Sequence, residues 1–148
     1  MMLHTKIIDA SVEKIKISNA ENFLNSSKFG AVIYFVGTVR DNNENKEVTG
    51  ITYDTKDSMV IKSFEEIYED AESELNIKNK AVFIEHVKGY VGLSEKSIII
   101  GVACKHRDEA YRLSRFIIEE IKKRTPIWKK EHYKNEESEW LKGVSLTQ

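Results

Sequence analysis

Two apolar runs that follow each other along the chain constrain the fold more than any other feature. Residues 81–87 and Lys96–Cys104 are rich in β-branched side chains, and the segment between them contains Gly89 and Gly92. Such runs predict two strands joined by a loop at 89–92, with no helix between them. This breaks a regular alternation of strands and helices, so we expect an α+β fold rather than a doubly wound sheet.

Two long amphipathic helices are predicted, one before and one after these strands. In Asp57–Leu75 and in residues 108–123, apolar side chains recur at spacings of three and four, which is typical of helices with one buried face. The second helix should end at Thr125, because Pro126 restricts the residue before it. The predicted buried stripes are Val60, Phe64, Ile67, Tyr68, Ala71 and Leu75 in the first helix, and Ala110, Leu113, Ser114, Ile117 and Ile121 in the second.

Shorter elements complete the predicted domain. Ser18 is a candidate N-cap for a short helix, and residues 30–39, apolar on both alternating faces, predict a central strand covered on both sides. The polar residues 40–46 predict a mobile loop. Short strands are also expected at Leu3–Asp9 and at residues 48–54, 127–132 and 139–141. With one proline and no Gly/Ser-rich stretch, residues 1–148 should form one domain with a mixed or antiparallel sheet.

Composition argues against several classes of function. The chain has 23 Lys and Arg against 24 Asp and Glu, so bulk charge implies neither nucleic acid nor a membrane surface as partner. No apolar run approaches the roughly 18 residues that a membrane span needs. Cys104 is the only cysteine, which excludes an intramolecular disulfide and fits a cytoplasmic protein. His4, His86 and His132 lack metal-ligand spacing, so no metal site and no cofactor are expected.

The charge is nevertheless unevenly distributed. Residues 105–134 contain ten Lys and Arg but five Asp and Glu, a local net charge of +5, whereas the other 118 residues carry −6. A basic region of this kind suggests an anionic ligand or an acidic partner. The alternative is that Lys122, Lys123 and Arg124 only complement the dipole at a helix C-terminus, for about 0.3–1 kcal/mol each, and composition alone favours this alternative.

The residues after the second helix suggest a more specific arrangement. If residues 127–131 are extended, Lys129 shares a face with Ile127 and Glu131 and can point back toward Lys122 at the end of the helix. Two lysines in one pocket suit phosphate binding, or a lowered pKa in one of them through like-charge proximity. A lysine with a lowered pKa can transfer protons near neutral pH.

A second candidate group lies between residues 96–104 and the following helix. Strand ends that lead into helix N-termini attract anions, and Arg107 could add a bidentate contact to phosphate or carboxylate. For His106, the more ordinary role of capping the helix or packing beneath the sheet remains the favoured alternative. Arg40 ends the other apolar strand, so Arg40, His106 and Arg107 would converge if the two strands are neighbours that end on the same side. Cys104 is expected to be a small core residue rather than a nucleophile.

Three segments together resemble the large, catalytic subunit of molybdopterin synthase. They are FVGTVRD at 35–41, ACKHRDEAY at 103–111 and KKRTPIWKKE at 122–131, followed by Trp140, and the resemblance runs from about residue 30 to residue 143. The third segment is the most specific. The resemblance implies an α/β-hammerhead-type fold and a homodimer within a heterotetramer, with a small ubiquitin-like subunit docked at each end.

The resemblance also implies a reaction and its residues. The small subunit would present a C-terminal Gly-Gly thiocarboxylate, and this chain would use it to place two sulfurs on cyclic pyranopterin monophosphate, forming the dithiolene of molybdopterin. Because the sulfur comes from the partner, the chain needs no catalytic cysteine. Matched position by position, the implied catalytic residues are Lys122 and Lys129, and the implied substrate-binding residues are Thr38, Val39, Arg40, His106, Arg107, Lys130 and Glu131.

Two departures from the family pattern and two alternatives accompany this prediction. His86-Val-Lys-Gly89 replaces the family's His-Arg-x-Gly, and Lys142 stands near the position of an arginine that many members carry after the C-terminal tryptophan. One alternative is a non-enzymatic basic module for RNA or an acidic protein. Against RNA, the aromatic residues of the basic region are few and scattered. The other alternative, an inactive dimeric scaffold of the same family, is disfavoured by the presence of both lysines.

Overall fold

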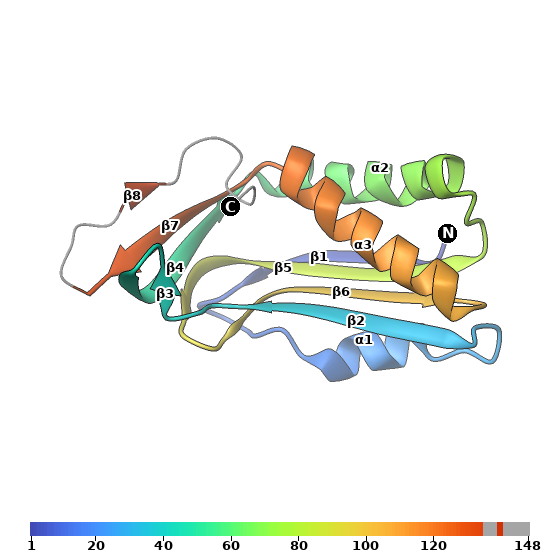
Figure 1. The fold of residues 1–148 in the computed structure, drawn as a ribbon, viewed down its shortest axis with the longest axis horizontal. Coiled ribbons are helices and arrows are strands. Elements are labelled where there is room, and N and C mark those ends of the chain that lie inside the picture. Colours follow the sequence, from blue (N-terminus) through green and yellow to red (C-terminus); the bar gives the residue numbers. More distant parts are fainter. Residues whose placement is uncertain (135–138, 141–148) are drawn as a thin grey trace.

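The computed structural model describes residues 1–134 and 139–140 of the chain. Within these residues the elements are β1 (Leu3–Asp9), α1 (Ile17–Leu24), β2 (Ala31–Thr38), β3 (Asn42–Asn43), β4 (Lys46–Thr55), α2 (Asp57–Leu75), β5 (Lys80–Gly92), β6 (Lys96–Cys104), α3 (Arg107–Arg124), β7 (Ile127–Tyr133) and β8 (Glu139–Trp140). Helices α2 and α3 cover one face of the sheet and α1 lies on the other, which confirms the α+β class (Figure 1). None of the described helices combines the length and the apolar character of a membrane span.

The strands form a mixed sheet in the order β2-β6-β5-β4-β7-β8, with β1 beside β5 and β3 beside β4. Every pairing is antiparallel except that of β1 with β5. Strand β5 changes partners along its length: it pairs with β6 as far as His86 and with β1 as far as Lys88, and residues 89–92 then pair with β4. Gly89, at this change, has a φ of 97°, which glycine adopts without strain. Strands β4 and β7 thus extend the sheet beyond the helices (Figure 1).

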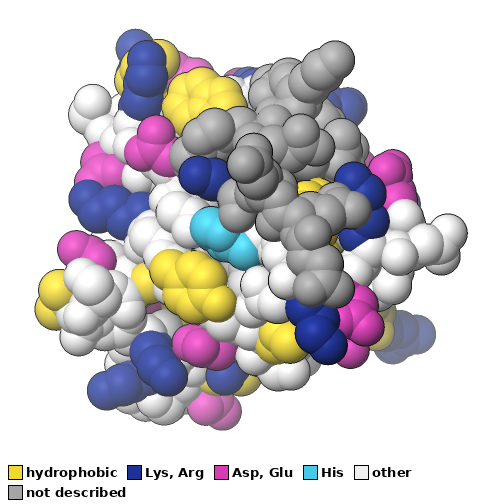
Figure 2. All heavy atoms as spheres, turned by 90° about the vertical axis from the view of Figure 1, so that its left-hand side faces the viewer, with side chains coloured by type: hydrophobic (Ala, Val, Ile, Leu, Met, Phe, Trp, Pro, Cys, Tyr) yellow, Lys and Arg dark blue, Asp and Glu magenta, His cyan; other side chains and the backbone are white. Residues whose placement is uncertain are grey.

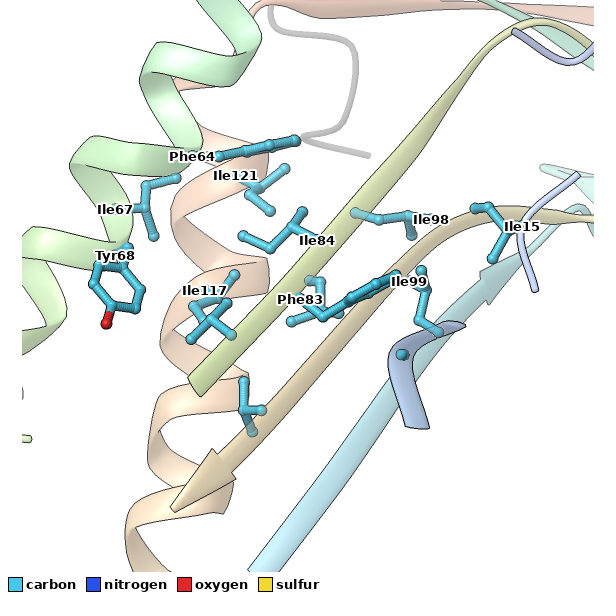
Figure 3. Packing of buried hydrophobic residues seen from close by; sticks show 14 of the residues in the cluster. Ile15, Phe64, Ile67, Tyr68, Phe83, Ile84, Ile98, Ile99, Ile117 and Ile121 are labelled. Atoms are coloured by element: carbon cyan, nitrogen blue, oxygen red, sulfur yellow. The ribbon is translucent and has the colours of Figure 1, made fainter. Parts of the chain in front are cut away.

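The core lies between the two long helices and strands β5 and β6. In Figure 3, Phe64 of α2 and Ile117 and Ile121 of α3 point toward Ile84 of β5, and all four side chains are completely buried. Burial of one such side chain contributes about 1.5–3 kcal/mol to stability. The predicted helical stripes are confirmed, except that Leu75 and Ser114 are partly exposed.

The prediction that residues 30–39 form a central strand was wrong. Strand β2 is the last strand on its side of the sheet and pairs only with β6 in the described residues. One face of β2 packs against α3, whereas α1 on the other face packs on β5 and β6. Val32 and Tyr34 therefore remain 41% and 37% exposed. The apolar pattern on both faces reflects an open edge, not a covered strand.

Three local predictions also need correction. Residues 40–46 are not a featureless loop: β3 and β4 form a tight hairpin in which Glu44 and Asn45 have φ values of 51° and 66°, as a two-residue turn of this kind requires. The short helix begins at Ile17 with Lys16 as its N-cap, so Ser18 lies inside it. The predicted loop at 89–92 belongs to β5, because those residues pair with β4. Of the predicted strand 139–141, Leu141 lies outside the described residues, as does Lys142.

Candidate active site

A pocket of 340 Å³ opens where the end of β2, the β3–β4 hairpin, the last turn of α3 and strand β7 meet. We call it the lysine pocket. It is lined by five residues that the sequence analysis selected, Thr38, Arg40, Lys122, Lys129 and Glu131, together with Asn42, Asn43, Val48, Ile51 and Tyr53. The predicted meeting of the two lysines in one pocket is therefore confirmed.

The turn between α3 and β7 places the two lysines together. The Thr125 N–H donates to the Ile121 carbonyl at 3.1 Å, and the Ile127 N–H donates to the Thr125 carbonyl at 2.9 Å. The Thr125 hydroxyl lies 2.8 Å from the hydroxyl of Ser63, which fixes the turn against α2. The turn leads from α3 into β7, and Lys122 before it and Lys129 after it line the same pocket.

The surroundings of Lys129 in the lysine pocket alter its pKa. It lies opposite Tyr53 across the β4–β7 pairing. Burial lowers the pKa of Lys129; the Glu131 carboxylate opposes this shift, and the positive charges of Lys122 and Arg40 add to it. The pKa of Lys129 therefore lies below its ordinary value, which favours proton transfer by this side chain near neutral pH.

Glu131 fixes the β3–β4 hairpin, which forms one wall of the lysine pocket. It is only 4% exposed. Its carboxylate oxygens accept hydrogen bonds from the Asn43 side-chain amide at 3.1 and 2.9 Å, and one of them accepts from the Tyr133 hydroxyl at 2.9 Å. Glu131 thus ties β3 to β7 and keeps an anion near Lys129. Sequence analysis missed Asn43 because the stretch around it carries no periodic pattern.

Replacement of Glu131 by Gln should shift the pH dependence of the reaction. Glu131 raises the pKa of Lys129, so its neutralisation lowers that pKa further. If Lys129 acts as the ammonium, the alkaline limb of kcat against pH should move to lower pH, because the active form is lost sooner. The control is Glu47→Gln, since Glu47 is exposed and pairs with Lys134 outside the pocket. An alkaline limb that stays in place in the Glu131 variant would contradict the role of Lys129.

A smaller chamber of 120 Å³ adjoins the lysine pocket and shares Tyr53, Lys122 and Lys129 with it. Tyr53 and Ser97 both line this chamber, Ser97 influences the pKa of Tyr53, and the Ser97 hydroxyl donates to the Gly37 carbonyl at 3.2 Å. His86 lies edge-on to the Tyr53 ring, at 4.9 Å between ring centroids, and burial lowers the pKa of His86 to about 4. These contacts connect Tyr53 of β4, which lies opposite Lys129, to Gly37 near the end of β2. Nothing in the local sequence pattern marks Tyr53 or Ser97.

The end of β2 supplies the other wall of the lysine pocket. Thr38 and Arg40 line the pocket, whereas Val39 between them is buried in the core. The Val39 N–H donates to the Glu95 carbonyl at 3.1 Å, and the Val39 carbonyl accepts from the Ser94 N–H at 2.8 Å. Val39 therefore fixes the backbone, which allows its two neighbours to face the pocket.

His106 and Arg107 lie at the opposite end of the sheet from Arg40. Strands β2 and β6 are neighbours but antiparallel: Ala31 pairs with Cys104, and Thr38 pairs with Lys96. The expected convergence of Arg40, His106 and Arg107 therefore does not occur within one chain. The His106 side chain is 72% exposed and lies 3.4 Å from the Glu109 carboxylate. It is the N-cap residue of α3 but makes no side-chain capping bond.

Two further residues from the sequence analysis lie away from the lysine pocket. Lys130 pairs with Thr52 and alternates with Lys129 along β7, so the two lysines point to opposite faces. Cys104 is buried, and burial raises the pKa of its thiol to about 11, so it is unsuited to act as a thiolate nucleophile. No group of three potential metal ligands occurs among the residues that the structure describes.

The end of the molecule that carries β3, β4 and β7 does not present a continuous positive surface. In the part of Figure 2 that is not grey, Lys and Arg side chains lie among Asp and Glu side chains. Along α3, basic residues pair with acidic ones: Arg112 with Asp108 at 3.0 Å, Lys123 with Glu120 at 3.4 Å, and Arg124 with Asp70 at 2.8 Å. Positive and negative side chains are therefore interspersed on this surface, and the alternative of a basic binding module is not supported.

Comparisons with known proteins identify relatives of this chain. The family model described as "MoaE protein" matches residues 10–124. The molybdopterin synthase catalytic subunit of Synechococcus elongatus is 37% identical over 141 residues, covering 95% of this chain and 85% of the relative. The crystal structure of molybdopterin synthase from Staphylococcus aureus superposes with a TM-score of 0.85 at 28% identity, covering 93% of this chain and 96% of that one.

A more distant structure shares the fold and contains a second subunit. It is a protein-protein complex of subunits 1 and 2 of the molybdopterin-converting factor from Helicobacter pylori, and it matches with a TM-score of 0.73 at 23% identity, covering 98% of this chain and 93% of that one. These matches cover most of the chain, and they confirm the family that the sequence resemblance indicated. The chain belongs to the MoaE family of molybdopterin synthase catalytic subunits, which are sulfurtransferases of molybdenum cofactor biosynthesis.

Proposed function

We propose that the lysine pocket is where sulfur passes from the thiocarboxylated C-terminus of a small ubiquitin-like subunit to cyclic pyranopterin monophosphate. The observation that carries this proposal is that Lys122 and Lys129 come from different elements and line one pocket with Arg40. Residues 1–148 would act as one catalytic domain in the cytoplasm. No cofactor of the chain's own is required, because the partner supplies the sulfur.

The pocket residues have different roles in the proposed reaction. The thiocarboxylate sulfur attacks an electrophilic carbon of the pterin side chain, forming a C–S bond, and a lysine ammonium protonates the departing oxygen. Water then attacks the acyl carbon of the resulting thioester, and the second ammonium stabilises the oxyanion. Cleavage of the acyl C–S bond leaves sulfur on the pterin and a carboxylate on the small subunit. Two such cycles give the dithiolene.

Arg40 and Thr38 are suited to hold the substrate phosphate at the mouth of the lysine pocket. A guanidinium binds phosphate through two parallel hydrogen bonds, and these bonds are present in the ground state and in the transition state alike. Glu131 is better suited to position Lys129 and the hairpin than to contact an anion, because its carboxylate already accepts bonds from Asn43 and Tyr133.

Replacement of Arg40 by Ala should therefore raise KM more than it lowers kcat. Arg40 would bind the phosphate equally well in the ground state and in the transition state, and the loss of such binding produces this pattern. Steady-state kinetics with the pterin substrate would measure it, with Arg115→Ala as the matched control, because Arg115 is exposed and pairs with Glu119 on α3. A loss confined to kcat would mean that Arg40 contacts charge that develops only during the reaction.

The position of β2 supports a homodimer with shared sites. An edge strand offers unpaired N–H and C=O groups to another strand. If β2 pairs antiparallel with β2 of a second copy, the Ala31 end of one chain lies beside the Thr38 end of the other. His106 and Arg107 follow β6 at the Ala31 end, so they would approach the lysine pocket of the second copy. Arg40, His106 and Arg107 would then serve one substrate together, although they lie far apart within one chain.

The direct test is to mix this chain with a thiocarboxylated small subunit and the pterin precursor and to look for the dithiolene product. The Helicobacter pylori complex supports the choice of a second subunit as partner. Sedimentation should show a complex at micromolar concentrations, and removal of the C-terminal glycines of the small subunit should weaken it. A complex without product would refute the catalytic assignment, whereas product without a separate small subunit would refute the sulfur source.

A further inference from the structure

A second pocket, of 580 Å³, lies at the end of the sheet away from the lysine pocket. We call it the rim pocket. Lys28 precedes β2, Lys78 and Lys80 lie at the start of β5, and Lys105 follows β6. These segments meet because Ala31, Cys104 and Lys80 are paired across neighbouring strands. The topology therefore gathers four lysines from three distant parts of the sequence. The reaction described above uses none of them.

The lining of the rim pocket carries one sign of charge. Besides the four lysines it consists of Met1, Met2, Phe29, Tyr68 and Asn79, with no carboxylate. Among the described residues, no Asp or Glu lies within ion-pair distance of these lysines. By contrast, Lys123 and Arg124 of α3 each have an acidic partner. Within the residues that the structure describes, the rim pocket is thus a concentration of positive charge without an ion-paired carboxylate.

Lys80 makes this pocket more than a group of surface lysines. Only 3% of Lys80 is exposed, and its ammonium donates to the Ile77 carbonyl at 3.2 Å and lies 4.2 Å from the centre of the Tyr68 ring. A buried ammonium without an anionic partner is costly, because it has lost its hydration. Burial accordingly lowers the pKa of Lys80, and the more distant Glu72 carboxylate opposes the shift only in part. An anion in the rim pocket would offset this cost.

We propose that the rim pocket binds a small polyanion of the diphosphate or triphosphate class. Lysine ammonium groups bind phosphate as point charges, and the cationic side chains that line this pocket are lysines. Lysines on three segments fit a ligand with several charged groups better than a single phosphate. The volume lies in the range of roughly 300–1,000 Å³ that is usual for small-molecule sites. Phe29 offers an apolar wall for an organic group such as a nucleoside.

Calorimetric titration with pyrophosphate, orthophosphate and ATP would test this proposal. The lysine pocket also attracts anions, and Arg40 is assigned to phosphate there, so the titrations should use the Arg40→Ala/Lys122→Ala/Lys129→Ala variant next to the wild type. Pyrophosphate should bind that variant with one site per chain and at least about tenfold more tightly than orthophosphate does, because charged hydrogen bonds add. Tighter binding of ATP would identify a nucleotide as the ligand, and equal binding would identify the free polyphosphate.

Substitutions of the rim-pocket lysines test whether pyrophosphate binds in this pocket. Lys80→Met keeps the apolar stem and removes the charge, and it should weaken pyrophosphate binding by about tenfold or more. The Lys28→Met/Lys105→Met variant changes only exposed positions, so it tests the same prediction if Lys80→Met fails to fold. Lys62→Met is the matched control, because Lys62 is an exposed lysine of α2 outside both pockets. Absence of binding to the Arg40/Lys122/Lys129 variant, or equal weakening by Lys62→Met, would overturn the proposal.

Discussion

Replacement of Lys122 or Lys129 by alanine should lower turnover by about 10²–10³-fold, because either change removes a group that transfers a proton or stabilises an oxyanion. Both side chains line the pocket and neither lies in the buried core. The variants should therefore fold and still bind the small subunit. Single-turnover formation of the dithiolene product would measure the loss, and circular dichroism and sedimentation would verify fold and complex.

Lys123 provides the matched control for this prediction. It is adjacent to Lys122 but rotated by about 100° around the helix, and its exposed side chain pairs with Glu120. Lys123→Ala should keep nearly full activity. If it were as damaging as Lys122→Ala, the cluster would act through bulk charge. Lys122→Arg refines the test, because arginine keeps the charge but does not readily release a proton. Retained activity in that variant would indicate electrostatic stabilisation instead of proton transfer.

Mixed dimers should recover activity that neither parent variant has. If Arg107 serves the lysine pocket of the second copy, a dimer of one Lys129→Ala chain and one Arg107→Ala chain contains one fully intact site. After subunit exchange in an equal mixture, about half of the dimers are mixed, so the rate should reach about a quarter of the wild-type rate. The rates should be measured at substrate concentrations well below KM, so that they include any effect of Arg107 on substrate affinity.

A second mixture controls for chance recovery. Lys129 and Arg40 line the same pocket of the same chain, so a dimer of Lys129→Ala and Arg40→Ala chains has no intact site. This mixture should stay as slow as its parents. If the Arg107 mixture also stayed slow while subunit exchange was complete, His106 and Arg107 would not act on the second copy, and the shared-site arrangement would be refuted.

The helices and the two lysines could be predicted from sequence because their signals are local. The stripes of α2 and α3 depend on spacings of three and four residues. The pairing of Lys122 with Lys129 needs only the helix end, the turn at Pro126 and an extended segment after it. The family resemblance then selected these lysines from a basic cluster that composition alone could not rank.

The remaining features depend on which strands pair over long distances, and no local pattern encodes this. The apolar faces of β2 are compatible with a central or an edge position until β6 is known to be its only neighbour among the described strands. The same pairing direction separates Arg40 from His106 within one chain. Tyr53 and Ser97 lie 44 positions apart in the sequence and become neighbours only through the sheet.

The strand order also affects how this protein can fold while it is being synthesised. Strand β1 pairs with β5, beginning with Leu3 opposite Val82, and β2 pairs with β6, beginning with Ala31 opposite Cys104. Apart from the short β3–β4 hairpin, the first half of the nascent chain therefore emerges from the ribosome before its partners exist. Strand β1 stays unpaired until β5 has emerged and β2 until β6 has emerged, and long-range pairing of this kind is slow and prone to aggregation. We expect the growing chain to depend on chaperones such as those that shield nascent polypeptides.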